Sequence, residues 1–209
     1  MGGSLGDRDG VIAAILPGFL APSAMMAPMA LGLARRGVQT ARVSLPRLAT
    51  GAVAALGDVL DAELARVCRE QDAEAVDLVA VSQGAILALW WLHQRPRANV
   101  RRLVTVGGPA GGTWFAAVGV ATMHVIAPGA RDSLPNSTII AAIGGRSPPG
   151  VPTTTIALTG DPVAPAARCR LVGATEIVLP RGPFWFPHQT LVFRRDVFDA
   201  IAAALQEPS

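Results

Sequence analysis

The sequence contains no lysine and no tyrosine, so its 18 basic residues are all arginine. These arginines are scattered singly and in pairs, such as Arg35-Arg36 and Arg194-Arg195, against 15 acidic residues. Proteins that bind nucleic acids instead carry a basic stripe, often with interleaved aromatic residues. The scattered charge therefore argues against a nucleic-acid partner, and the net charge of +3 identifies no other partner.

Cysteine is almost absent, because Cys68 and Cys169 are the only two such residues and lie far apart in the sequence. They match neither the spacing of a metal site nor a disulfide framework. We expect two thiols without a metal ion, and their role stays open.

Charged residues make up only 16% of the chain, whereas hydrophobic residues make up 51% and the mean hydropathy is +0.41. A membrane-spanning helix needs roughly 20 apolar residues without breaks. Two of the three long uncharged stretches, 11–34 and 103–130, are interrupted by proline or glycine. Buried parallel strands also read as continuous apolar runs. We therefore expect a soluble α/β core rather than a spanning segment.

The N-terminal residues 1–10 lack a basic segment followed by an apolar stretch and a cleavage site of small residues. We expect these ten residues to be flexible. The interpretation is a cytoplasmic chain, or a secreted chain from which an export signal has been trimmed.

Apolar runs with strand character alternate with segments of helical periodicity along most of the chain. This alternation predicts βαβ units and one mostly parallel sheet of about six strands, covered by helices on both faces. The length favours a single domain over 1–209. The expected strands are 11–16, 40–45, 76–81, 100–106, 153–158 and 176–179. The expected helices are 23–36, 50–70 beginning at a Thr50 cap, 84–94 and 189–205.

The segment 107–152 is irregular and rich in glycine and proline. Its apolar stretch fits either a helix packed on the sheet or a partly mobile flap over a site. We favour the packed helix.

The most informative stretch is VDLVAVSQGAILALWWL, in which a β-branched run reaches Ser82 and turns at once into a helix-forming run. Small residues, Ala80 and Gly84, stand two places before and after the serine. This is the pattern of a nucleophile elbow, where a strained turn projects the hydroxyl and strand and helix pass closely. The Gln83 amide would then lie at a helix N-terminus, where it can donate to an oxyanion. The alternative is a buried strand followed by a chance turn and a core helix.

A serine nucleophile needs a base, and the sequence offers three histidines. His93 is placed at the end of a helix, and His124 in the irregular segment is expected to be packed. His188 follows the last predicted strand, and functional groups of open α/β sheets gather at the carboxyl ends of strands. His188 is therefore the predicted base, with a structural loop histidine as the alternative.

The base needs an acid that orients it, and Asp161 also follows a predicted strand at its carboxyl end. Asp132 is better explained as the cap of a turn, and Glu176 stands at the wrong end of its strand. A second oxyanion donor is expected in the loop after the first strand. There, Gly18 permits a close approach and the Phe19 amide is the candidate.

These residues together resemble the α/β-hydrolase superfamily, specifically its small bacterial lipase-like serine esterases, over about 11–205. The similar segments are ILPGFLAP for the oxyanion loop, AVSQG for the elbow, LVTVGGPAGGTWF after the next strand, APGARDSLPNS, TGDPVAP for the acid and PHQT for the histidine. The order Ser82, Asp161, His188 is the order of that family. The chain departs from the family pattern at Pro17, Ala80, Val81 and Pro187, none of which is a triad member.

The resemblance implies a carboxylic ester hydrolase with a Ser82–Asp161–His188 triad, an acyl-enzyme intermediate and no metal or organic cofactor. The same triad would also serve an acyltransferase, and a non-catalytic or membrane-associated protein on this fold is a third reading. A small-molecule or lipid ester is the expected substrate, with transient contact to a lipid surface as an additional option. Five aromatic residues are candidates for an acyl pocket or for plain core: Trp114, Phe115, Phe184, Trp185 and Phe186.

Overall fold

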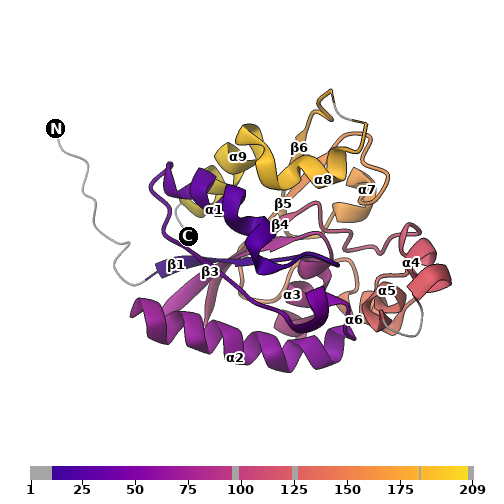
Figure 1. Ribbon diagram of the computed structural model, residues 1–209, viewed down its shortest axis with the longest axis horizontal. Helices are drawn as coiled ribbons and strands as arrows, with labels where there is room; N and C mark the ends of the chain where they lie inside the picture. Colours follow the sequence, from indigo (N-terminus) through magenta and orange to yellow (C-terminus); the bar gives the residue numbers. More distant parts are fainter. Residues whose placement is uncertain (1–10, 96–98, 124–126, 184, 207–209) are drawn as a thin grey trace.

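The computed structural model describes residues 11–95, 99–123, 127–183 and 185–206, so the predicted flexible segment 1–10 lies outside the described residues. Its centre is one six-stranded sheet in the order β2-β1-β3-β4-β5-β6, in which every neighbouring pair is parallel (Figure 1). The strands are β1 Val11–Leu16, β2 Thr40–Arg42, β3 Ala75–Val81, β4 Val100–Val106, β5 Thr153–Leu158 and β6 Thr175–Leu179. The predicted fold class is confirmed.

Helices cover both faces of this sheet, which explains why its central strands are apolar without alternation. Leu78 and Ala80 of β3 face one core layer, whereas Val79 and Val81 face the other. The first layer is covered by α2 Val53–Gln71, α3 Gln83–Gln94 and α6 Thr138–Ile143. The second is covered by α1 Ala27–Ala34 and α9 Arg195–Gln206, opposite α2 in Figure 1.

The start of α2 differs from the prediction. The chain forms a 3-10 turn, η2 Pro46–Ala49, in which Arg47, Leu48 and Ala49 all have positive φ, and the helix begins only at Val53. Thr50 is not its cap, because the Thr50 hydroxyl donates to the Arg47 carbonyl instead.

Asp132 supplies the missing cap of α2 from 79 positions away. Its Oδ2 accepts from the Val53 amide at 2.7 Å, which satisfies one of the orphan donors of the helix. The sequence analysis expected Asp132 to cap a turn, and the carboxylate caps a distant helix.

Two other predicted helices are shorter than expected. The segment 23–36 opens with the 3-10 turn η1 Ser23–Met26 before α1. The closing helix is divided into α8 Pro187–Thr190, η3 Leu191–Phe193 and α9, with extended backbone at Arg194. The Arg194 guanidinium donates to the Pro180 and Arg181 carbonyls, which holds this break against the loop after β6.

The segment 107–152 forms three short helices. Two of them, α4 Ala116–Met123 and α5 Pro128–Asp132, lie beyond the carboxyl ends of the strands (Figure 1), whereas α6 packs against α3. We favoured a helix packed on the sheet, but α4 packs chiefly against α5 (Figure 1). A further short helix, α7 Ala166–Cys169, follows β5. Among the described residues, no helix combines the length and apolar character needed to span a membrane.

Candidate active site

Ser82 occupies the turn between β3 and α3 with φ 54° and ψ −125°, a strained conformation for a residue with a side chain. Its amide donates to the carbonyl of Val106 in the neighbouring strand β4 at 2.9 Å, which fixes the turn at the carboxyl ends of the strands. Gly84 must be small, because an added Cβ would lie 2.5 Å from the Pro17 carbonyl oxygen. The loop after β1 therefore passes directly over the start of α3.

Gly18 brings the same loop against the serine. A Cβ on Gly18 would lie 2.8 Å from the Ser82 Cβ, closer than folded proteins tolerate, and 3.4 Å from the Ser82 Oγ. Phe19 and Gln83, the residues whose amides were predicted as oxyanion donors, border the same cavity as Ser82. The structure thus brings together the loop and the elbow that the sequence analysis paired.

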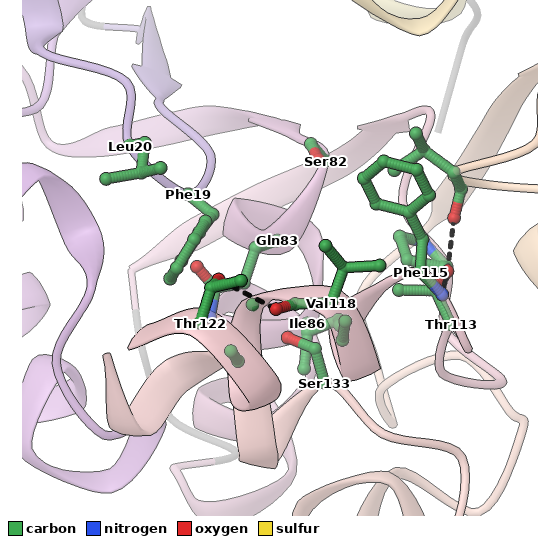
Figure 2. Close-up of a pocket in the computed structure, with 15 residues that line it drawn as sticks. Phe19, Leu20, Ser82, Gln83, Ile86, Thr113, Phe115, Val118, Thr122 and Ser133 are labelled. Carbon is green, nitrogen blue, oxygen red and sulfur yellow. Dashed lines mark hydrogen bonds between the residues drawn. The ribbon is translucent and has the colours of Figure 1, made fainter. Parts of the chain in front are cut away.

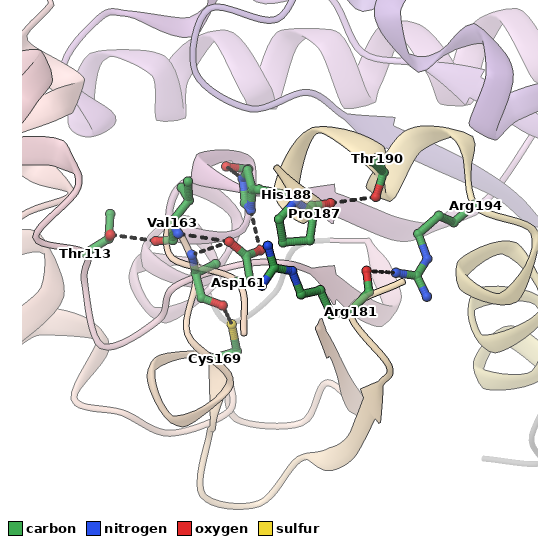
Figure 3. Close-up of polar contacts among 11 residues, drawn as sticks. Thr113, Asp161, Val163, Cys169, Arg181, Pro187, His188, Thr190 and Arg194 are labelled. Carbon is green, nitrogen blue, oxygen red and sulfur yellow. Dashed lines mark hydrogen bonds and ion pairs between the residues drawn. The ribbon is translucent and has the colours of Figure 1, made fainter. Parts of the chain in front are cut away.

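His188 lies in α8, just beyond β6, and bridges the predicted serine and acid. Its Nε2 is 2.8 Å from Ser82 Oγ. Its Nδ1 is 2.7 Å from Asp161 Oδ2 (Figure 3). An ionised carboxylate only accepts hydrogen bonds, so Nδ1 carries the proton and Nε2 of the neutral ring accepts from the serine hydroxyl. The three side chains form one hydrogen-bonded chain.

Asp161 is held on both of its oxygens. Oδ1 accepts from the amides of Val163 and Ala164 at 2.9 and 3.1 Å, while Oδ2 faces His188. The Val163 carbonyl accepts in turn from the Thr113 hydroxyl at 2.6 Å (Figure 3). The carboxylate has no exposed side-chain surface, and this anchoring leaves it one orientation toward the imidazole.

The other candidates for the base and the acid make contacts elsewhere or lie outside the described residues. His93 Nδ1 contacts the Leu89 carbonyl in its own helix at 2.8 Å, Glu176 pairs with Arg170, and His124 lies outside the described residues. No group of three or more His, Cys, Asp or Glu within the described ranges is arranged to hold a metal ion.

A cavity of about 280 Å³ opens beside Ser82 (Figure 2). Its walls come from the loop after β1, the start of α3, the segment before α4, and one face of α4 and α5. Phe115 borders the cavity and is itself half-exposed. Trp114, Trp185 and Phe186 are exposed and do not border the cavity, and Phe184 lies outside the described residues. The lining residues are Phe19, Leu20, Ser82, Gln83, Ile86, Pro109, Thr113, Phe115, Ala116, Val118, Gly119, Thr122, Ala130, Ser133 and Val163.

The contribution of α4 to this cavity was not predicted from the sequence. Val118 and Thr122 are four residues apart and therefore share one side of α4, and Phe115 precedes the helix by one residue. That spacing was visible in the sequence. It indicated an apolar face without indicating that the face borders a cavity instead of the sheet.

The cavity carries no charged side chain among its lining residues, and apart from Ser82 its hydroxyl groups already donate to backbone carbonyls. Thr113, Thr122 and Ser133 donate to the backbone carbonyls of three other residues, Val163, Val118 and Gly129 respectively. The donors are therefore occupied within the wall, so the cavity suits an uncharged, largely apolar group.

No protein-family profile matches the sequence, and no curated protein matches it. Solved structures do. The mature form of the Bacillus licheniformis lipase BlEst2 is 15% identical with a TM-score of 0.71, over 95% of this chain and 93% of that one. The product of gene lin2722 from Listeria innocua is 14% identical with a TM-score of 0.71, over 96% of each chain. The metagenomic carboxyl esterase MGS0156 is 14% identical with a TM-score of 0.70, over 96% of this chain and 77% of that one. This chain therefore has the α/β-hydrolase fold, which it shares with these solved structures.

Proposed function

We propose that the protein is a serine hydrolase of carboxylic esters. The observation that carries this proposal is the hydrogen-bonded chain Asp161–His188–Ser82, whose two links measure 2.7 and 2.8 Å and which ends at an apolar cavity. A serine hydroxyl in ordinary surroundings is a weak nucleophile. The imidazole at Ser82 Oγ supplies the base that activates it.

The reaction proceeds through a covalent acyl-enzyme. Ser82 Oγ attacks the ester carbonyl carbon while His188 Nε2 takes the hydroxyl proton. His188 then returns this proton to the leaving alcohol as the ester C–O bond breaks. In the second half, water loses a proton to His188 and attacks the acyl carbon. The proton passes back to Ser82 as the carboxylic acid leaves.

Asp161 holds the imidazole in the tautomer that this cycle needs and stabilises the imidazolium that forms. The amides of Phe19 and Gln83 are assigned to the developing oxyanion. Both residues line the cavity together with Ser82, and the Gln83 amide is the first of α3. One such donor contributes on the order of 10²–10³ in turnover.

A fluorophosphonate probe tests the proposal because it reacts covalently with activated serines. We expect labelling of the wild type at Ser82 and none of Ser82→Ala, whose ester hydrolysis should fall by on the order of 10⁶. Ser133 is the matched control, since its hydroxyl also borders the cavity but donates to Gly129. Ser133→Ala should still be labelled at Ser82. Folded wild-type protein that resists the probe, or Ser82→Ala with undiminished activity, would refute the assignment.

A further inference from the structure

The side chain of Gln83 reaches from the first residue of α3 to α5. Its Nε2 donates to the Gly129 carbonyl at 2.7 Å across 46 positions of sequence, and the glutamine is only 6% exposed. A backbone carbonyl only accepts, so the amide nitrogen must face Gly129 and the orientation of the amide is fixed. Gln83 therefore links the residue beside Ser82 to a separate segment of the chain.

Gly129 is where three segments meet. Its amide donates to the Thr50 carbonyl at 3.0 Å, in the loop before α2. A Cβ at this position would collide with Gln83 Nε2 and lie 2.7 Å from the Gly51 carbonyl oxygen. Only a glycine allows α3, α5 and the loop before α2 to approach this closely.

The roof of the cavity, defined as Phe115 and α4, rests on α5. Ala130 in α5 borders the cavity, and a Cβ added to Gly119 of α4 would lie 3.2 Å from the Ala130 Cβ. Phe115 and Val118 project from the roof into the space beside Ser82 (Figure 2). The roof and α5 are therefore in direct contact where both border the cavity.

The Gln83 hydrogen bond is not explained by stability alone. The Gly129 carbonyl also accepts from the Ser133 hydroxyl at 2.8 Å, so it keeps a partner without Gln83. Gln83 Oε1 is buried and has no partner among the described residues, which costs free energy that an apolar side chain would avoid. What the glutamine contributes that such a side chain does not is the tie to α5.

We propose that the Gln83 side chain is a positioning residue that ties the roof to the nucleophile and thereby sets the range of acyl chains the cavity accepts. The selectivity part rests on the proposed esterase function. The structural part, coupling of α3 to the roof through Gly129, does not.

Gln83→Met tests the coupling, because methionine keeps the length and the backbone amide but loses the donor. We expect amide hydrogen exchange in the roof to accelerate about fivefold, as loss of one net hydrogen bond predicts, with β3 and β4 unchanged. The matched control is Ser133→Ala, which removes the other donor to the same carbonyl within the α5 region and should alter roof exchange less than about twofold. Gln83→Leu replaces the methionine variant should that one not fold.

Selectivity is measured as kcat/KM for p-nitrophenyl esters from acetate to dodecanoate. A freed roof admits longer chains, so the long-to-short ratio should rise at least about threefold in Gln83→Met. If Gln83 had only a structural role, the substitution would lower kcat/KM for all of the esters by the same factor. Roof exchange identical to wild type overturns the coupling, and an unchanged ratio overturns the role in selectivity. Wild type inactive on every ester would refute the esterase proposal, while the exchange experiment would still decide the coupling.

Discussion

Gly18 and Ser82 lie so close together that there is no room for a methyl side chain at position 18. The nearest atoms to an added Cβ are the Ser82 Cβ at 2.8 Å and the Val81 carbonyl oxygen at 3.0 Å, both held by the sheet. An alanine at Gly18 must therefore push its own loop away, and that loop carries the Phe19 amide.

Gly18→Ala should lower kcat on esters by on the order of 10² because the Phe19 amide loses its place, while the sheet stays folded. Steady-state kinetics and a thermal melt check this. Gly51→Ala is the matched control, since its nearest neighbour would be Leu56 at 3.4 Å, an ordinary contact. Equal activity of the two alanine variants would argue against a role for this loop in the reaction.

Asp161→Asn should reduce kcat by about 10⁴, because an amide facing His188 holds the imidazole in the wrong tautomer. The fold should survive, since the remaining oxygen still accepts from the Val163 and Ala164 amides. Ester kinetics with circular dichroism make the measurement. Asp132→Asn provides a comparison carboxylate outside the hydrogen-bonded chain, and a similar loss in that variant would contradict the assignment of the acid.

Asp132→Ala should lower the free energy of unfolding by about 1 kcal/mol, the usual contribution of a helix cap, because the Val53 amide loses its acceptor. Asp132→Asn retains an acceptor oxygen and should lose less. Urea denaturation of both variants checks the order. Equal stability of the alanine variant and the wild type would show that water replaces the carboxylate.

The same carboxylate predicts a pH dependence. Burial raises the pKa of Asp132, and the bond from the Val53 amide opposes this rise only partly. The native state therefore holds the proton more tightly than the unfolded chain. The stabilisation that protonated Asp132 provides is complete at pH values below the pKa of this residue in the unfolded chain. It is lost as the pH rises through the pKa of Asp132 in the folded protein. The unfolding free energy of Asp132→Asn relative to wild type should increase from about pH 3 to about pH 7. A constant difference would contradict the shift.

The two thiols should differ in reactivity. Burial, followed by the negative charges of Asp161 and Glu176, raises the pKa of Cys169 to about 12, whereas Cys68 is only partly buried. At pH about 8, roughly one Cys169 in 10⁴ is a thiolate. Iodoacetamide should modify Cys68 well before Cys169, as followed by peptide mass mapping. In guanidinium the two rates should converge, and native rates that already match would contradict the burial of Cys169.

Much of the fold was predictable because its signals are local. The segments Val11–Leu16, Val100–Val106 and Thr153–Leu158 formed strands with the predicted bounds, because their β-branched and apolar residues favour a buried strand whatever its partners are. The juxtaposition of Ser82, Asp161 and His188 was predictable for a related reason. Carboxyl ends of parallel strands meet at one edge, so three loops after strands converge.

The features that the sequence did not reveal depend on distant contacts. Arg47, Leu48 and Ala49 have no intrinsic preference for positive φ. The local sequence therefore does not predict the left-handed turn, after which α2 begins later than expected. The cap of that helix comes from Asp132, and the break at Arg194 follows from carbonyls in another loop. The roof of the cavity was not predicted for the same reason. The periodicity of α4 indicates which of its faces is apolar but not which element packs against that face.

The order of the strands along the sequence also determines when, during synthesis, Ser82, Asp161 and His188 can form their hydrogen bonds. Ser82 follows β3 in the middle of the sheet, whereas His188 arrives only after β6 has been added at its edge. Every nascent chain that ends before His188 thus carries the serine without its base. A growing polypeptide would gain the proposed activity in one late step, when the outermost strand docks.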